Sequence, residues 1–276
     1  MLQRKKTRVI LAAAASILIA TFAVAAVLWS PWRQSSTSDA PVQDADLPTI
    51  TIGADILEPS FYVSSAGGYI GIDADIATEA CKRAGLKPKF TTVSWAERDE
   101  ALASGAIDCI WGCFAIDGRE DDYLWTESYR DSSIAILVKS SLPFHSLTDY
   151  VGSGCIAVRA NSAAARMLQA ACSDNPDISI HTYGNADMAR VAFVKGYTDA
   201  WAGPKMALET IRFEYPREYR YLESNLATTH LGVAFEKNGD TAYRDRLDKA
   251  LASMRNDGTI ERIVKRYEKE AADGDR

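Results

Sequence analysis

Short apolar runs alternate with amphipathic, helix-like segments along most of the chain. After an apolar run at 50–53, a helix is expected at about 73–84, because Ile76 and Ala80 fall on one helical face. Gly85 then supplies a stop signal for this helix. The strand–helix order predicts a βαβ unit with a parallel sheet. The further elements of this unit are a strand at 89–93, a helix at 96–104 and a strand at 107–111.

A second unit of the same kind follows in the middle of the chain. Its expected strands are 134–138, 155–158, 178–183 and 198–202, and its expected helices are 162–172 and about 188–195. Two amphipathic helices are expected near the C-terminus, separated by a turn at Asn256-Asp257-Gly258. The pattern therefore predicts an α/β protein of two lobes.

The N-terminus has the pattern of an export signal. Four basic residues lie within 4–8 and precede an uncharged apolar run at 9–29, which predicts an apolar helix. The length of this run favours a retained anchor, whereas the small residues Ala23-Val24-Ala25 favour cleavage, so 1–32 is a signal peptide or a membrane anchor. Residues 33–48 are polar and predict a flexible linker. In both cases the rest is extracytoplasmic, either secreted or anchored to the outer face of the membrane.

The composition argues against several classes of function. The net charge of −6 gives no basic surface for nucleic acid. The three histidines are isolated, so no metal site is expected, and Gly152-Ser153-Gly154 precedes a strand rather than following one, so no cofactor is expected. The carboxylates Asp73 and Asp75 open a helix, which fits capping better than acid–base catalysis. We therefore expect no catalytic residues.

Five cysteines in an exported chain allow at most two disulfides. Cys155 begins a predicted strand and Cys172 ends the helix that runs back from it, so these two are the favoured pair. Cys109 and Cys113 are four residues apart in extended chain, too far for a direct bond, and are interpreted as core thiols.

The segment Gly71-Ile72-Asp73-Ala74-Asp75-Ile76 resembles the signature of the family 3 extracellular solute-binding proteins, the polar amino-acid receptors of ABC importers. Other landmarks occur in family order across 49–268. They are Gly53-Ala54-Asp55, Pro59-Ser60-Phe61, Ser94-Trp95, Gly105-Ala106-Ile107-Asp108, Ser146-Leu147, Gly196 with Asp199-Ala200, and Asn256-Asp257-Gly258-Thr259.

This resemblance implies a two-lobed periplasmic-binding-protein-like (Venus-flytrap) fold with a hinge. Lobe 1 is then 49–130 plus 230–276, and lobe 2 is 131–229. A small polar, amino-acid-like ligand is expected between the lobes, and closure around it would be detected by an ABC transporter permease. The binding protein itself is expected to be a monomer.

The resemblance also implies residue roles. Asp55, Phe61 and Trp95 occupy positions that contact the ligand's side chain, and Glu58 replaces a frequent aromatic residue, so two acids would suit a cationic ligand group. The alternatives are that the two acids are solvated loop residues and that Trp95 is a core residue. Arg119 is the candidate for the ligand's carboxylate; its spacing from Asp108 is one residue short, so a surface ion pair is an equal alternative.

Other positions depart from the family pattern. Ala115 stands in place of a hydroxyl that assists the arginine, and Gly112 and Cys113 belong to a wall that is more apolar than usual. In lobe 2, Ser162 keeps a hydroxyl at a helix start, where amides bind anions. Pro204 stands in place of the aspartate that binds the ligand's ammonium, and proline cannot pair with a cation.

Three functions follow, in order of preference. The first is a substrate-binding component of an ABC importer. The second is a ligand-sensing ectodomain that signals to a membrane partner, and the third is a dehydratase-type enzyme on the same fold.

Overall fold

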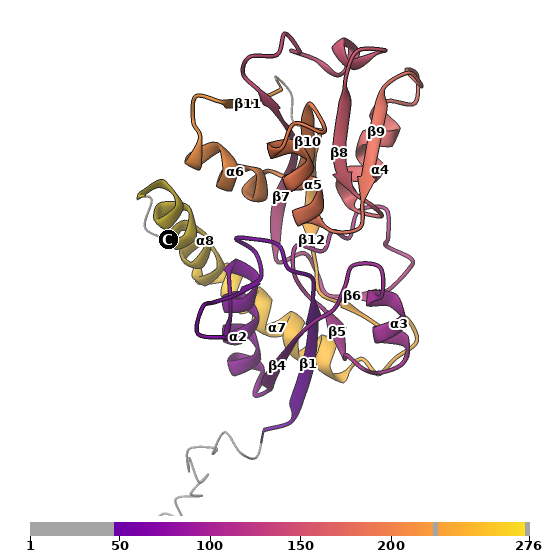
Figure 1. The fold of residues 1–276 in the computed structure, drawn as a ribbon. Helices are drawn as coiled ribbons and strands as arrows, with labels where there is room; N and C mark the ends of the chain where they lie inside the picture. Colours follow the sequence, from indigo (N-terminus) through magenta and orange to yellow (C-terminus); the bar gives the residue numbers. More distant parts are fainter. Residues whose placement is uncertain (1–46, 223–225, 274–276) are drawn as a thin grey trace, which may run out of the picture. The chain divides into compact units, whose positions relative to one another are not determined.

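Two large β-sheets organise the described part of the chain after residue 46 (Figure 1). A third, two-stranded sheet consists of β2 (Tyr62–Val63) and β3 (Tyr69–Ile70). The computed structural model describes residues 47–222 and 226–273. The predicted N-terminal helix, and the linker up to residue 46, lie outside the described residues. None of the helices in the described part is long and apolar enough to cross a membrane.

The first sheet has the strand order β4-β1-β5-β13-β6, and we call the part built around it lobe 1. β1 runs parallel to β4 and β5, whereas β13 runs antiparallel to β5 and β6. Because the parallel strands end at one edge of the sheet, the loops that follow them are brought together there. The strands are β1 (Thr49–Ala54), β4 (Lys87–Thr92), β5 (Cys109–Ile110), β6 (Leu124–Trp125) and β13 (Ala234–Phe235).

Helix α2 (Ile72–Ala84) buries the face that the periodicity predicted, with Ile76 and Ala80 inaccessible to solvent. It begins after Gly71, which has φ 125°, and a Cβ there would lie 2.4 Å from the carbonyl oxygen of Ser60. Only glycine fits both this backbone and this contact. Gly85 ends the helix in the left-handed conformation, as expected.

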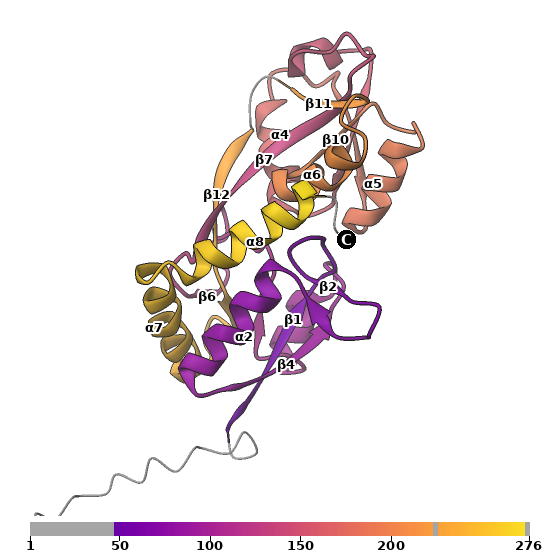
Figure 2. The ribbon, with the colours of Figure 1, turned by 90° about the vertical axis from the view of Figure 1, so that its left-hand side faces the viewer.

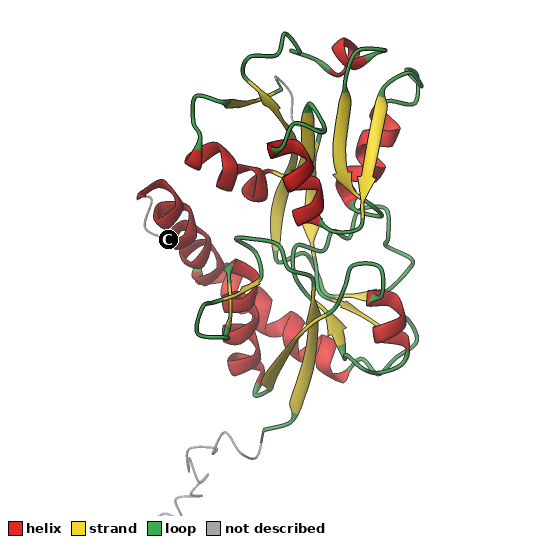
Figure 3. Cartoon of the chain, in the orientation of Figure 1, coloured by secondary structure: helices red, strands yellow, loops and turns green. Residues whose placement is uncertain are grey.

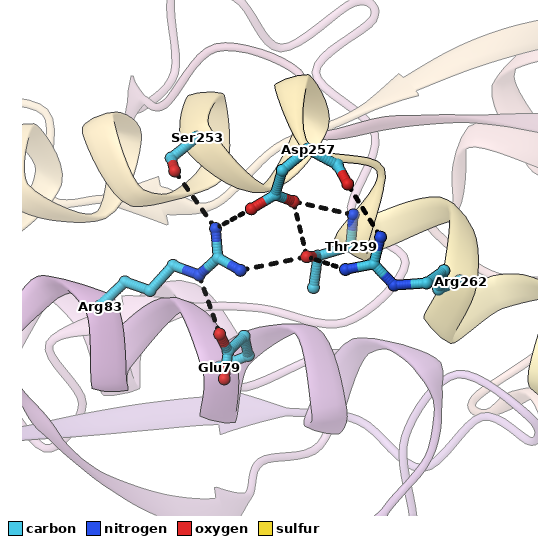
Figure 4. Close-up of polar contacts among 6 residues, drawn as sticks. All are labelled: Glu79, Arg83, Ser253, Asp257, Thr259 and Arg262. Atoms are coloured by element: carbon cyan, nitrogen blue, oxygen red, sulfur yellow. Dashed lines mark hydrogen bonds and ion pairs between the residues drawn. The ribbon is translucent and has the colours of Figure 1, made fainter.

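The C-terminal helices α7 (Ala242–Asn256) and α8 (Thr259–Asp273) pack against α2 (Figure 2). A polar network joins the turn between them to α2, as Figure 4 shows. Arg83 donates to Asp257 at 2.6 Å and to the Thr259 hydroxyl at 3.0 Å, and Asp257 also accepts from Thr259. The turn that the sequence marks at 256–258 is therefore fixed to lobe 1.

The second sheet has the order β11-β7-β10-β8-β9, with β12 also paired to β7, and we call the part around it lobe 2. β8 is parallel to β9 and β10, so this sheet also has an edge where parallel strands end. The strands are β7 (Arg130–Lys139), β8 (Cys155–Arg159), β9 (Ser179–Tyr183), β10 (Ala200–Pro204), β11 (Tyr219–Tyr221) and β12 (Ala227–Leu231).

Helices cover the second sheet, and Figure 3 shows them beside its strands. α4 is capped by the side chain of Ser162, and α5 by that of Asn185. The sequence pattern predicted α4 and α5 but missed α6, which begins directly after Pro204. The helices are α4 (Ala163–Ala171), α5 (Ala186–Val194) and α6 (Lys205–Glu214); the shorter α3 (Arg98–Ala103) belongs to lobe 1.

The chain passes between the lobes along the antiparallel pair of β7 and β12, in which Arg130 lies opposite Leu231. The boundaries implied by the family resemblance, 130/131 and 229/230, fall within this pair. Such a pair of connecting strands is a natural hinge, because a few residues at the ends of elements can absorb a rotation. The division at these residues stays a prediction.

A buried carboxylate, Asp73, joins the start of α2 to the hinge. It accepts hydrogen bonds from the amide of Cys113 at 2.7 Å and the hydroxyl of Tyr129 at 3.0 Å, and from the hydroxyl of Ser60. Its ion pair with Arg130 spans 3.2 Å. The side chain does not cap its helix, contrary to the interpretation from sequence, because all of these partners lie outside α2.

The predicted Cys155–Cys172 disulfide is absent, and all five cysteines are free thiols. The helix α4 contacts β10 as well as β8, the strand that Cys155 begins. Instead Cys172 joins the apolar core, and the thiol of Cys155 faces the carbonyl of Tyr197 at 3.6 Å.

We predict that Asp73→Asn lowers the free energy of unfolding by about 3–5 kcal/mol, because it leaves the Arg130 guanidinium buried without its counter-ion. Chemical denaturation measures this. Asp75→Asn is the matched control in the same helical turn; Asp75 is about one-third exposed and pairs with Arg266, so a loss of about 1 kcal/mol or less is expected. Equal losses in the two variants would contradict the role given to Asp73.

A second prediction concerns Asp257. Its hydrogen bonds to Thr259 and Arg83 lower its pKa to about 2 in the folded protein. A carboxyl with a depressed folded pKa stabilises the fold above its unfolded pKa, about 3.9, and loses this effect as the pH falls toward the folded value. The stability difference between wild type and Asp257→Asn should therefore be constant near neutral pH and shrink between about pH 4 and pH 2 in urea titrations. A difference independent of pH would contradict this.

Third, we predict that all five cysteines are labelled by a thiol reagent after denaturation without reductant. In the native protein at pH 8 Cys155 should react first, since it is partly exposed, while burial raises the pKa of Cys81 to about 12 and that of Cys113 to about 11. Mass spectrometry locates the labels, and Cys155→Ser should lose the fast phase. Labelling of only three cysteines, with Cys155 and Cys172 unlabelled, would show that the predicted disulfide forms.

Candidate functional site

The carboxyl ends of parallel strands from both lobes meet around a small cavity, which we call the inner cavity. Lobe 1 contributes the segments after β1, β4 and β5, and lobe 2 contributes the segment after β8 and the strand β10 itself. This is where ligands bind in α/β folds of open sheets. The lining residues are Leu57, Trp95, Cys113, Ala115, Arg119, Ile134, Arg159, Ser162, Ala163, Ala164, Ala186, Trp201, Ala202, Gly203, Pro204, Thr229 and Leu231.

Six of the sequence-predicted site residues line this cavity. Arg119 is among them and is only 6% exposed, so the alternative of a surface ion pair is not what the structure shows. Between Asp108 and Arg119 the chain passes through Cys113, which has φ 48°. The six are Trp95, Cys113, Ala115, Arg119, Ser162 and Pro204.

The other four predicted residues lie elsewhere. Phe61 is buried in lobe 1 and stacks on Tyr69, with ring centroids 5.0 Å apart, so it is a core residue in this structure. Gly112 lies behind the wall, where a Cβ would be 3.3 Å from that of Ala54. Glu58 is exposed and lines a wider neighbouring cavity of about 780 Å³, which we call the outer cavity.

Asp55, the fourth, follows β1 and is bound by an arginine that the sequence analysis did not single out. Arg159, the last residue of β8, donates to Asp55 at 2.9 Å across the two lobes. Its guanidinium also lies 3.9 Å from the centroid of the Trp95 ring. The sequence did contain a signal for Arg159, because a charged residue at the carboxyl end of a buried strand lies where ligands bind in such folds.

A backbone carbonyl of lobe 2 forms a second set of contacts with lobe 1. The oxygen of Asn161 accepts from the indole nitrogen of Trp95 at 3.1 Å and from the guanidinium of Arg119 at 2.5 Å. Asn161 has φ 55°, a conformation that asparagine adopts more readily than most residues. A third arginine, Arg166, donates to the carbonyl of Asp117 at 2.6 Å. Arginines thus form most of the polar contacts between the lobes here.

These arginines perturb one another. Burial, and then the positive charges of Arg166, Arg98 and Arg159, lower the pKa of Arg119 to about 9. Burial likewise lowers the pKa of Arg159, against the effect of Asp55, and burial raises the pKa of Asp55. The region is therefore one in which an added negative charge is favoured.

The inner cavity has a volume of about 30 Å³. A water needs at least about 10–15 Å³, whereas pockets for small ligands measure about 300–1,000 Å³. The cavity shares Leu57, Ala186 and Trp201 with the outer cavity, so the two are adjacent. A solute larger than a water can enter only if the lobes or their side chains move apart.

No pair of carboxylates suited to acid–base chemistry lines the inner cavity. Asp73 is ion-paired with Arg130, and Asp75 accepts from Tyr267 at 2.7 Å. In residues 47–222 and 226–273 no three His, Cys, Asp or Glu side chains are grouped to hold a metal ion.

Residues 50–270 match the family described as bacterial extracellular solute-binding proteins, family 3. The lysine/arginine/ornithine-binding periplasmic protein of Escherichia coli is 22% identical over 240 residues, which cover 83% of this chain and 92% of that protein. The glutamine-binding protein GlnH of Bacillus subtilis, an ABC transporter protein, is 25% identical over 211 residues, 75% of each chain.

Among solved structures, the substrate-binding protein of an ABC uptake transporter from Streptococcus pneumoniae, with bound histidine, superimposes with a TM-score of 0.73. It is 21% identical and covers 81% of this chain and 94% of its own. The predicted periplasmic-binding-protein-like fold is therefore confirmed.

Proposed function

Because the chain belongs to the bacterial extracellular solute-binding proteins of family 3, we propose that it captures a small polar solute in the inner cavity for an ABC importer. The observation that carries this is Arg119, a buried guanidinium that lines the cavity and has no carboxylate partner among the described residues. A buried charge without a counter-ion is costly, so its position fits a ligand that supplies one. The names of the relatives, which bind amino acids, support a solute of that size.

The proposed cycle is closure of the two lobes on the solute. Opening about the β7–β12 pair would separate Asn161 from Trp95 and Arg119, and Arg159 from Asp55. A solute that binds both lobes would favour the closed state by its contacts with each of them. A permease that recognises the closed arrangement would then receive loaded protein in preference to empty protein.

Several features of the proposal come from sequence and family alone. The basic and apolar N-terminal segment supports export, after which the two lobes act outside the cytoplasmic membrane, secreted or anchored to its outer face. The permease partner and the monomeric state belong to the same proposal.

We predict that Arg119→Met weakens solute binding about tenfold or more, the expected loss for one charge-assisted contact. A fragment beginning at residue 47 is screened for thermal stabilisation by amino acids and organic acids, and the affinity for each hit is then measured by calorimetry. Arg212→Met is the control, since Arg212 pairs with Glu209 on α6 and does not line the inner cavity. Equal affinity of wild type and Arg119→Met for every hit would refute the site.

A further inference from the structure

The charges that line the inner cavity all have one sign. Among the described residues, the charged ones that line it are Arg119 and Arg159, and none of its described lining residues is an acid. Both arginines are more than nine-tenths buried, with 6% and 7% of their surface exposed. Burial weakens the screening of such charges by water, so they act strongly on whatever occupies the space between them.

Arg119 is bonded only to neutral groups in the described part of the chain. Its guanidinium donates to the carbonyls of Ala115, at 3.4 Å, and Asn161, at 2.5 Å. An arginine has five N–H donors in a planar fork that fits a carboxylate. Burial, and then the positive charges of Arg166 and Arg98, lower the pKa of Arg119.

Arg159 reaches Asp55 through one nitrogen, Nη1. Its other nitrogens have no hydrogen bond to the residues that the structure describes, so they can donate to an oxygen of a ligand. Its position against the face of Trp95 fixes the guanidinium in the cavity wall. Asp55 is occupied by this pair and is not free to receive a cation.

A cationic group of a ligand finds no carboxylate among the described residues that line the inner cavity. Pro204, at the position where the family resemblance calls for an acid, has neither a carboxylate nor an amide proton. The second acid expected from the sequence, Glu58, lines the outer cavity instead. The remaining wall is largely apolar, with two tryptophans, Trp95 and Trp201. An ammonium group would lose its water and meet like charges, apolar surface and the neutral hydroxyls of Ser162 and Thr229, but no carboxylate among the described lining residues.

We propose that the inner cavity selects a small carboxylate anion that carries no ammonium group, with Arg119 binding the carboxylate and Arg159 excluding cations. The apolar wall receives the body of such an acid, and the spare donors of Arg159 receive a carbonyl or hydroxyl oxygen on it. This inference rests on the proposed function and assigns the chemical class of its solute. It reverses the expectation, drawn from Asp55 and Glu58, of a cationic ligand group.

Matched pairs of compounds that differ at the ammonium group test this. L-leucine is compared with 4-methyl-2-oxopentanoate, and L-phenylalanine with 3-phenylpropanoate, by thermal shift and calorimetry on the fragment beginning at residue 47. We expect at least one deaminated acid to bind about tenfold or more tightly than its amino acid, and L-arginine and L-lysine not to bind. Tighter binding of the amino acid in both pairs would overturn the inference while leaving the proposed function intact.

Two variants of the ion pair make the test independent of any one compound. With the best anion, Arg159→Met should weaken binding about tenfold, because it removes a donor and leaves the charge of Asp55 in place. Asp55→Asn should tighten binding by roughly threefold or more, because it removes a negative charge beside the anion. Weaker binding in Asp55→Asn, with circular dichroism unchanged, would show that Asp55 holds a ligand cation and would overturn the inference.

The absence of binding is also informative. If neither member of either pair stabilises the protein, the inference is wrong for these acids and their class. If, in addition, the wider panel of solutes gives no hit, the proposed function fails with it. A hit elsewhere in the panel that depends on Arg119 would preserve the function and discard only the anion assignment.

Discussion

One buried ion pair, Asp73 with Arg130, holds the start of α2 in lobe 1 against the start of the strand that leads to lobe 2. Asp73 belongs to the first turn of α2, and Arg130 is the first residue of β7, the strand that leaves lobe 1 for lobe 2. The same carboxylate holds the amide of Cys113 in the cavity wall. Although burial opposes the charge of Arg130, the carboxylate of Asp73 raises the pKa of Arg130 above its ordinary value. Removing one partner of a buried ion pair destabilises a fold strongly, whereas the intact pair adds little net stability. The pair therefore acts mainly to hold these two segments in one arrangement.

The Asp73–Arg130 pair belongs to a network that joins the elements of lobe 1 to one another, whereas fewer contacts join lobe 1 to lobe 2 across the cavity. The wall of the inner cavity on the lobe 1 side is attached to α2 through Cys113, and α2 is attached to the C-terminal helices through Arg83 and Asp257. The contacts that cross the cavity are of another kind: single hydrogen bonds from arginines and an indole to Asn161 and Asp55. A rigid frame with a few exchangeable contacts across the cleft is the arrangement that closure about a hinge requires.

The sequence predicted the helices and strands better than the side-chain contacts around the inner cavity. The periodicity located α2 and its glycine stop, and family landmarks placed Trp95, Arg119 and Ser162, which do line the cavity. The predictions from sequence were wrong where the role of a residue depends on side-chain contacts between distant segments. Nothing local in the sequence says that Asp55 is taken by Arg159, 104 residues away, or that Phe61 turns into the core. The predicted disulfide was wrong for a related reason, because the pairing of two cysteines depends on where the ends of separate elements lie in space, which the local pattern does not determine.

The charge balance of the inner cavity is the observation that separates the proposed ligand from a cationic amino acid. At 22% identity a shared fold is compatible with an altered ligand, because specificity depends on the few side chains at the strand ends. Here those ends carry arginine after β8 and proline at the end of β10, while the acid after β1 is already paired. An ammonium must be matched by an acceptor when it is buried, and a carboxylate by a donor. The inner cavity offers guanidinium donors and lacks a free acid among its lining residues, so its chemistry favours an anion.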